Sequence, residues 1–344
     1  MHSKASEHVS QAINHSADQA RHAATGIPLD LIQAEMLEVA TILEREMSSR
    51  YPRVNEVVSY GCMLGGKRLR PALLLLTAKA LGQVNSHHHT LAAVLEMIHT
   101  ATLVHDDILD DADERRHLQT VHARWNTETS VLLGDFLFTH AFYLASTLPT
   151  TYAALTIGKA TNAVCEGELR QISSKGEFDL NEEDYLSIIE AKTAELCACA
   201  CQLGAHYASV DPVVVQQAEQ FGRALGIAFQ IVDDLLDLEG TEDKIGKTLG
   251  TDLDQQKPTL PLIHALNTCP SAVREELLTI LNGPAVERKR MLLPMLRELD
   301  SFTYTRDRAI HFVKTAQRSI ESWPAGEAKT ALCELAQFVL RRCY

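Results

Sequence analysis

The chain has 344 residues, 46% of them hydrophobic and 22% charged, and a formal net charge of −13. This acidic balance argues against a nucleic-acid-binding surface, which needs an excess of basic residues. Glycine (17) and proline (11) are sparse, which disfavours many short strands joined by tight turns and favours long helices in a globular protein. An anionic substrate remains possible if clustered carboxylates hold divalent cations, because bound cations reverse the local charge.

The first 27 residues are polar and weakly patterned, so we expect a leader over residues 1–27 ahead of an all-helical domain over residues 28–344. They show no signal-peptide pattern. The strongest apolar run, Ala72 to Thr77, is far too short to cross a bilayer. We therefore expect a cytoplasmic protein without stable membrane insertion.

From Pro28 onward, apolar residues recur at three- and four-residue spacings, which is typical of amphipathic helices. Helices are predicted over about 28–47, 54–64, 71–81, 88–111, 129–146, 152–173, 182–207, 212–238, 258–268, 272–282, 286–298, 304–321 and 325–341. No stretch alternates with the period of a strand, and neither a solenoid repeat nor a proline-rich linker divides the chain. The sequence predicts one all-α domain.

The eight cysteines contain no CxxC pair. Cys197, Cys199 and Cys201 alternate within a predicted helix and so point to different faces. Small buried thiols in a reducing cytosol explain this pattern better than a metal cluster does.

Two aspartate motifs of the form Asp-Asp-x-x-Asp stand out in the predicted helices. The first consists of Asp106, Asp107 and Asp110, and the second of Asp233, Asp234 and Asp237. Residues four apart share one helix face, so Asp106 and Asp110 point the same way, as do Asp233 and Asp237. Gln230 lies on the face of the second motif.

Apolar sequence flanks both motifs, and neighbouring carboxylates weaken an isolated helix by repulsion. One such motif would be interpreted as a charged surface, but two copies favour a functional site. Mg²⁺ prefers a few carboxylates together with waters and phosphate oxygens. Two such helices facing each other would bind a diphosphate through Mg²⁺.

Basic residues supply a third component. The segment Gly65-Gly66-Lys67-Arg68-Leu69-Arg70-Pro71 places three cations on a turn before a helix N-terminus, where anions are favoured. An ordinary basic loop is the alternative, but Arg115-Arg116 and Lys192-Thr193 add further basic sites. His99 lies two helical turns before Asp106 on the same face; such a histidine is usually a core residue, but here it is a plausible diphosphate donor.

Over roughly residues 55–265 the chain resembles the trans-isoprenyl diphosphate synthase family. The resemblance is carried, in this order, by GGKRLRP, IHTATLVHDDILD with a following RR, AKTAEL, FQIVDDLLD, GKTLGTDL and KPTLPLI. The resemblance implies an all-helical bundle around a central cavity (the isoprenoid synthase fold), usually as a homodimer. Two positions depart from the family pattern. His117 replaces the glycine that commonly follows the arginine pair, and Asp254-Gln255-Gln256-Lys257 replaces an acidic-glycine-lysine turn.

The resemblance also implies roles for single residues. Isopentenyl diphosphate would be bound by Lys67, Arg70, His99 and Arg116. Mg²⁺ would be held by Asp106 and Asp110, with Asp107 in support, and by Asp233 and Asp237. The allylic diphosphate would be contacted by Arg115, Lys192, Thr193, Gln230, Lys247 and Lys257. We place the six aspartates with Lys192 and Lys247 in the catalytic set.

The implied reaction is ionisation of the allylic C–O bond, attack by the double bond of isopentenyl diphosphate and loss of a proton. The departed diphosphate would accept the proton, so we assign no side-chain base. Water would trap the cation, which requires an apolar cavity.

Product length should depend on the depth of that cavity. Ala101 and Thr102 lie just upstream of the first motif, and neither is aromatic. By resemblance this favours a long chain, such as octaprenyl diphosphate, over farnesyl or geranylgeranyl diphosphate. The floor could instead lie at Ile98 or Leu95, one and two turns further down.

Other classes fit less well. A terpene cyclase needs no second diphosphate site, and a head-to-head condensing enzyme would carry DxxxD motifs. A non-catalytic regulatory subunit should have eroded aspartates, and a calcium-binding helical protein would lack the phosphate-binding cations. The partners that we expect are two prenyl diphosphates and a second copy of the chain.

Overall fold

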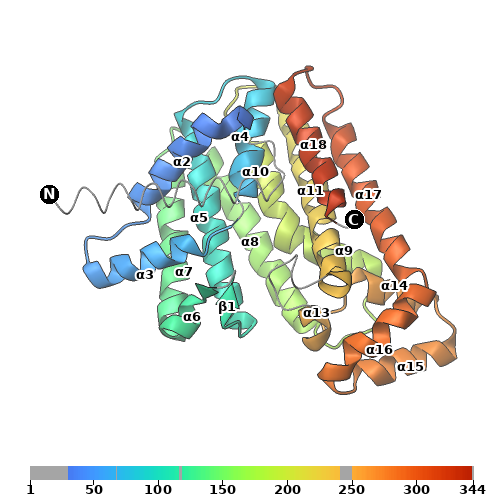
Figure 1. The fold of residues 1–344 in the computed structure, drawn as a ribbon. Helices are drawn as coiled ribbons and strands as arrows, with labels where there is room; N and C mark the ends of the chain where they lie inside the picture. The colour runs from blue at the N-terminus through green and yellow to red at the C-terminus, as the bar shows by residue number, and fades with distance from the viewer. Residues whose placement is uncertain (1–29, 67, 116–117, 241–249, 343–344) are drawn as a thin grey trace.

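The computed structural model describes residues 30–66, 68–115, 118–240 and 250–342. They form a bundle of helices with one very short hairpin (Figure 1), which confirms the predicted all-α fold. The predicted leader over residues 1–27 lies outside the described residues, as do Lys67, Arg116, His117 and Lys247. The division into leader and domain therefore stays a prediction.

The helices are η1 (Asp30–Ile32), α2 (Gln33–Glu46), α3 (Pro52–Met63), α4 (Leu69–Leu81), α5 (Ser86–Leu109), α6 (Val121–Arg124), α7 (Thr127–Ser146), α8 (Tyr152–Ser173), α9 (Glu182–Ile189), η2 (Glu190–Ala194), α10 (Glu195–His206), α11 (Pro212–Glu239), α13 (Thr251–Asp254), α14 (Leu260–Thr268), α15 (Ser271–Leu281), α16 (Ala285–Glu298), α17 (Ser301–Ser319) and α18 (Glu327–Arg341). The strands β1 (Glu114–Arg115) and β2 (Leu118–Gln119) pair antiparallel, with Glu114 opposite Gln119.

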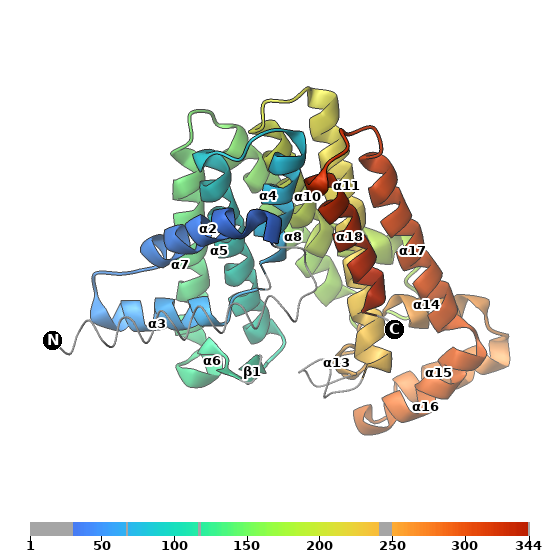
Figure 2. The ribbon, with the colours of Figure 1, turned by 45° about the horizontal axis from the view of Figure 1, so that its top comes forward.

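The long helices pack side by side around a buried centre. α10 packs against α11 and α4, α11 packs against α17, and α5 packs against α7. Helices α14, α15 and α16 form an arm, in which α15 packs against α16 and α16 lies beside the short α13 at the foot of α11 (Figure 2). A second, smaller apolar cluster under this arm joins Leu253, Leu277 and Leu292 to Leu235 of α11.

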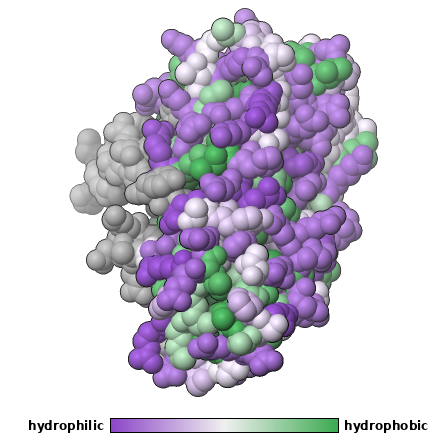
Figure 3. All heavy atoms as spheres, turned by 90° about the vertical axis from the view of Figure 1, so that its right-hand side faces the viewer, coloured by the Kyte–Doolittle hydropathy of each residue, from purple (hydrophilic) through white to green (hydrophobic). Residues whose placement is uncertain are grey.

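The apolar run predicted at Ala72 to Thr77 lies in α4, whose residues from Pro71 to Ala78 are all buried. A helix that is apolar all round must be enclosed by its neighbours, and α4 is enclosed by α5, α10 and α18. The face that carries the arm and α17 is mostly hydrophilic, with scattered hydrophobic residues (Figure 3). Among the described residues, no helix combines the length and the apolar character needed to cross a membrane.

Many predicted helix starts are explained by local capping. The side chain of Asn126 accepts a bond from the N–H of Thr129 and starts α7. Asp211 caps α11, and Pro212 occupies the first helical position, where its missing N–H costs nothing.

Three features differ from the prediction. The single helix expected over 182–207 is divided into α9, the π-helical turn η2 and α10. The hairpin β1–β2 and the short helices α6 and α13 were not predicted. These elements are two to five residues long, so apolar periodicity cannot reveal them.

Candidate active site

The first aspartate motif lies at the C-terminal end of α5. Asp106 and Asp107 occupy its last turn, and the N–H of the C-cap residue Asp110 donates to the carbonyl oxygen of Asp106 at 2.8 Å. Asp107 is buried, and its Oδ1 accepts bonds from Nε and Nη2 of Arg115 in β1, each at 2.8 Å. Asp107 therefore anchors the hairpin, whereas Asp106 is half-buried and Asp110 is exposed.

The second motif lies in the last turns of α11. Asp234 is buried, and its two oxygens accept bonds from the hydroxyl of Tyr185 and from Nε2 of Gln230, each at 2.7 Å. Asp233 lies on a more accessible face, where its Oδ1 is 2.7 Å from Nη2 of Arg342. Here too, one aspartate of the adjacent pair is buried and the other is only partly buried.

The segment over residues 250–257 connects the two motifs. Oδ2 of Asp237 accepts a bond from the main-chain N–H of Asp252 at 3.2 Å. Nζ of Lys257 lies 3.1 Å from Oδ1 of Asp110 and 3.9 Å from Oδ1 of Asp252. Because one short segment contacts both Asp110 and Asp237, the two motifs border a single site.

Lys192 and Thr193 enter this site from the π-helical turn η2. The hydroxyl of Thr193 donates to Oε1 of Gln230 at 2.8 Å. Nζ of Lys192 lies 2.6 Å from Oε2 of Glu168 and donates to Oε1 of Gln171 at 2.7 Å. The predicted pair from AKTAEL and the predicted Gln230 are therefore brought together.

Close packing of α8 accompanies the π turn. A Cβ atom added to Gly167 would lie only 2.7 Å from the main-chain nitrogen of Lys192. Glycine at this position lets α8 approach η2, and π turns are frequent at functional sites.

Negative charge accumulates around the first motif. Burial, with the charges of Glu168 and Asp110, raises the pKa of Asp106 to about 6 against the opposing charge of Lys192. Burial by itself would lower the pKa of Lys192, but Asp106 and Glu168 outweigh it and raise the pKa, so the ammonium group stays charged. A further cation would relieve the repulsion between these carboxylates.

Buried carboxylates also lie close together at the second motif. Burial and the charge of Asp252 raise the pKa of Asp234, and burial and the charge of Asp237 raise the pKa of Asp252. Among the described residues, however, no three His, Cys, Asp or Glu side chains converge in a ready-made cation site. Several motif carboxylates instead form ion pairs with basic side chains, for example Asp110 with Lys257.

The glycine-rich loop before α4 lies against His99. A Cβ atom on Gly66 would lie 2.6 Å from Cδ2 of His99, so any larger residue here would force the imidazole to shift. Arg70 follows in the first turn of α4, and within the described part of the chain its buried Nε has no hydrogen-bond partner. An unsatisfied buried donor costs about 1–3 kcal/mol, and an anionic ligand would satisfy it.

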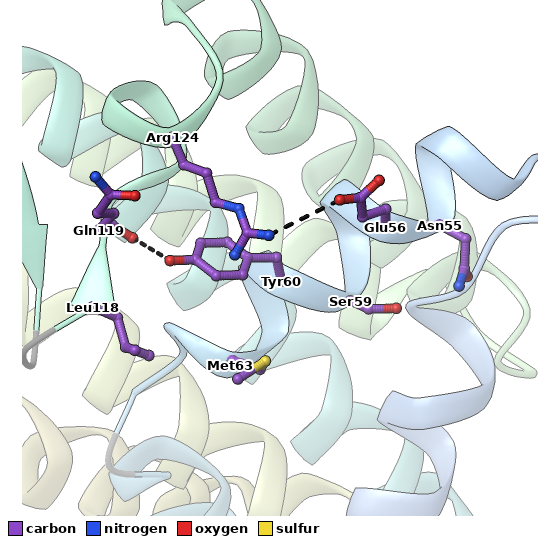
Figure 4. Close-up of a pocket in the computed structure, with 8 residues that line it drawn as sticks. All are labelled: Asn55, Glu56, Ser59, Tyr60, Met63, Leu118, Gln119 and Arg124. Carbon is purple, nitrogen blue, oxygen red and sulfur yellow. Dashed lines mark hydrogen bonds and ion pairs between the residues drawn. The ribbon is translucent and has the colours of Figure 1, made fainter.

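A pocket of about 80 Å³ lies between these elements and is lined by Gln171, Ser174, Leu180, Tyr185, Ile188, Ile189, Lys192, Gln230, Asp234, Asp252, Lys257, Pro258 and Thr259. A larger, open pocket of about 660 Å³ lies elsewhere, between α3 and the β2–α6 region (Figure 4). There the guanidinium of Arg124 lies 4.3 Å over the ring of Tyr60. None of its lining residues is a predicted site residue, whereas Lys192, Gln230, Asp234 and Lys257 line the smaller pocket.

The predicted chain-length wall lies within α5. Ile98 and Ala101 are fully buried in the main core. Thr102 is half-buried and donates to the carbonyl oxygen of His99 at 2.8 Å. Their role in setting product length stays a prediction.

The chain resembles known proteins over most of its length. The polyprenyl synthetase family matches residues 51–295, which include both aspartate motifs and the bridging segment. The chain belongs to the polyprenyl synthetase family. It is 34% identical over 319 residues to an octaprenyl diphosphate synthase from Escherichia coli (strain K12), covering 91% of this chain and 97% of the relative.

Solved structures in this family have the same fold. A decaprenyl diphosphate synthase from Rhodobacter capsulatus superposes with a TM-score of 0.86 at 33% identity, covering 92% of this chain and 98% of the other. A polyprenyl synthase from Caulobacter crescentus CB15, solved in complex with calcium and isoprenyl diphosphate, gives 0.84 at 34% identity, covering 91% and 96%.

Sequence reasoning missed several residues of the site in this polyprenyl synthetase. They are Glu168, Gln171, Tyr185, Asp252 and Arg342. Glu168 and Gln171 are three residues apart on one helix, a spacing that places them on the same face. Asp252 lies within the GKTLGTDL segment that carries the family resemblance. The sequence therefore contained a signal for these three residues. Nothing local marks Arg342. Lys67, Arg116 and Lys247 were predicted but lie outside the described residues.

Proposed function

We propose that this protein is a Mg²⁺-dependent all-trans polyprenyl diphosphate synthase that adds isopentenyl diphosphate to an allylic diphosphate head to tail. The observation that carries the proposal is the bridge from Asp110 through Lys257 and Asp252 to Asp237, which brings both motifs to one site. The names of the octaprenyl and decaprenyl relatives support a long-chain product such as octaprenyl diphosphate.

The carboxylates suit Mg²⁺, which is bound through oxygen. Asp106 and Asp110 would hold it on one side of the site, and Asp233 and Asp237 on the other. Burial, with the nearby charges of Glu168 and Asp110, raises the pKa of Asp106, and a bound cation would stabilise its charged form. Bound Mg²⁺ would neutralise negative charge on the diphosphate that leaves the allylic carbon.

The protein's own residues have separate tasks in this scheme. Lys192 stays charged beside Asp106 and would stabilise the leaving diphosphate as the allylic C–O bond breaks. Arg70 and His99 would hold the diphosphate of isopentenyl diphosphate, so that its double bond attacks the allylic carbon. The new C–C bond forms, and the departed diphosphate takes the proton. The apolar α5 wall, including Ala101, would exclude water from the cation.

A homodimer forms part of the proposal. Large apolar side chains are exposed on the neighbouring helices α7 and α8. These residues are Val131, Leu132, Tyr143, Leu155, Leu169 and Ile172. Contiguous exposed apolar patches mark protein interaction surfaces, and we propose that a second copy of the chain covers these side chains. A cytoplasmic location is also proposed, and the buried free thiols of Cys197, Cys199 and Cys201 suit a reducing compartment.

The direct test combines purified protein, Mg²⁺ and radiolabelled isopentenyl diphosphate with dimethylallyl, geranyl, farnesyl or geranylgeranyl diphosphate. Dephosphorylated products are sized by reversed-phase chromatography. Products longer than geranylgeraniol are expected. Products that stop at farnesol or geranylgeraniol would replace the long-chain assignment with a short-chain one, and no product with any primer would favour a non-catalytic subunit.

A further inference from the structure

Helix α16 lies in the arm, in the last quarter of the chain, and it sends a buried arginine toward the bridging segment. The guanidinium of Arg288 makes four hydrogen bonds, all to main-chain carbonyl oxygens. Nη1 donates to Leu253 at 3.1 Å and to Asp254 at 3.0 Å, while Nε and Nη2 donate to Gly283 at 3.2 and 3.0 Å. Arg288 thus ties the end of α13 to the end of α15.

Burial makes these bonds important. Arg288 is only 9% exposed, and a buried charged group is tolerated only when polar partners surround it. The last carbonyl groups of a helix lack partners within that helix, so the end of α13 offers suitable acceptors. Removing the guanidinium would leave these carbonyls and a void behind the segment.

The opposite side of the same segment faces the site. There the N–H of Asp252 donates to Asp237 and Nζ of Lys257 contacts Asp110. The N–H of Lys257 donates to the carbonyl of Asp252 at 2.8 Å and closes the turn. The turn therefore has Arg288 at its back and both aspartate motifs at its front.

A second residue of α16 reinforces this link. Nζ of Lys289 donates to the carbonyl oxygen of Asp237 at 3.2 Å. The N–H of Gly250 donates to the same carbonyl oxygen at 3.0 Å. α16 thus reaches both the bridging segment and the end of the second motif.

We propose that Arg288 is a positioning residue, which acts through the 250–257 turn to hold Lys257 and Asp252 between the two aspartate motifs. The effect on catalysis rests on the proposed synthase activity, whereas the effect on the turn does not. The arm is therefore a support for the active site.

The test begins with Arg288→Met, which keeps the length of the side chain but removes its donors. Arg290→Met on the same helix is the matched control, because Arg290 is exposed. Arg288→Met should lower kcat/KM about 10- to 100-fold, as misplacement of site groups by about 1 Å does. Arg288→Lys should recover part of the loss, and Arg290→Met should behave like the wild type.

A double-mutant cycle separates positioning from general damage. If Arg288 acts through Lys257, then Arg288→Met in a Lys257→Met background should cost no more than roughly threefold further. Full additivity of the two losses would overturn the proposal, as would unchanged kinetics of Arg288→Met. If Arg288→Met does not fold, Arg288→Lys and Arg288→Gln take its place in the same cycle.

Hydrogen exchange tests the turn without any substrate. In Arg288→Met, main-chain amides of residues 252–257 should exchange faster than in the wild type and in Arg290→Met, while those of α4 and α5 should not change. Uniform acceleration across the chain would show a purely structural role and overturn the proposal. If the wild type makes no prenyl product, the proposed function fails, but the exchange result still decides whether Arg288 holds the turn.

Discussion

Nη2 of Arg342 lies 2.7 Å from Oδ1 of Asp233, which joins the end of the chain's last described helix to the first carboxylate of the second motif. The same guanidinium lies 4.7 Å over the ring of Phe229, one turn earlier on α11. The contact covers the accessible member of the motif's aspartate pair. A divalent cation that binds Asp233 must therefore displace Arg342 or share the carboxylate with it.

Replacing Arg342 should make the protein easier to activate with Mg²⁺. Partly exposed ion pairs are worth at most about 1 kcal/mol, so Arg342→Met should lower the Mg²⁺ concentration for half-maximal activity by about two- to fivefold. Titration of the synthase rate with Mg²⁺ at saturating substrates measures the effect. Arg341→Met is the control, since Arg341 lies against the ring of Phe338. An unchanged or higher Mg²⁺ requirement in Arg342→Met would contradict competition at Asp233.

Loss of either Asp106 or Asp233 should abolish most turnover. Asp106→Ala and Asp233→Ala should each lower kcat by about 100-fold or more, because charge stabilisation at the leaving group is lost. Circular dichroism should show the same helix content, since neither residue is fully buried. Asp307→Asn, an exposed change on α17, serves as the control. Full activity in both alanine variants would refute the metal assignment.

The fold was largely predictable because the apolar periodicity of a long helix is visible in the sequence itself. The helix predicted over 152–173 is α8 with the same bounds, and α11 differs from its prediction by one residue. In both, an apolar stripe continues for five turns or more, so periodicity is unambiguous. The π turn was not predictable, because its residues continue the helical pattern and Gly167 shows its effect only in the packed structure.

The site was predictable where its residues cluster in the sequence, and not where folding brings them together. Both aspartate motifs are visible as short runs, and the structure places them at one site. Arg288 and Arg342 are ordinary basic residues in amphipathic helices. Arg342 pairs with Asp233, and Arg288 reaches the carbonyls of Leu253 and Asp254 more than thirty residues earlier, so only the three-dimensional arrangement reveals these contacts.

His88 should make the fold sensitive to mild acid. Its Nδ1 accepts a bond from the N–H of Asn85 at 3.0 Å, and its Nε2 lies 3.1 Å from the carbonyl oxygen of Gly204. Burial lowers the pKa of His88 to about 4 from its ordinary 6.5. The unfolded chain therefore binds a proton more readily, and this contribution to stability is present above pH 6.5 and lost as the pH falls toward 4.

Denaturant unfolding at pH 7 and at pH 4.5 measures this loss. One pKa unit corresponds to about 1.4 kcal/mol, so His88 should account for roughly 3 kcal/mol over the full range. In His88→Gln the pH dependence should shrink by about that amount, while Ser86→Ala at the start of the same helix should keep the wild-type dependence. Equal pH dependence in His88→Gln and the wild type would exclude His88 as the cause.

Ala101→Phe tests where the product chain ends, because Ala101 is completely buried. If the residue borders the cavity, the phenyl ring would fill space that the growing chain uses. The product ladder should then shorten, and the free energy of unfolding should change little. If Ala101 instead packs in a solid core, the ring would overpack it, and stability should fall by about 1–3 kcal/mol while product length stays the same.

Val213→Phe, an exposed change at the distant start of α11, controls for added aromatic bulk. Product sizing and unfolding of the same protein samples thus separate the two cases, and the second result would move the floor to Ile98 or Leu95.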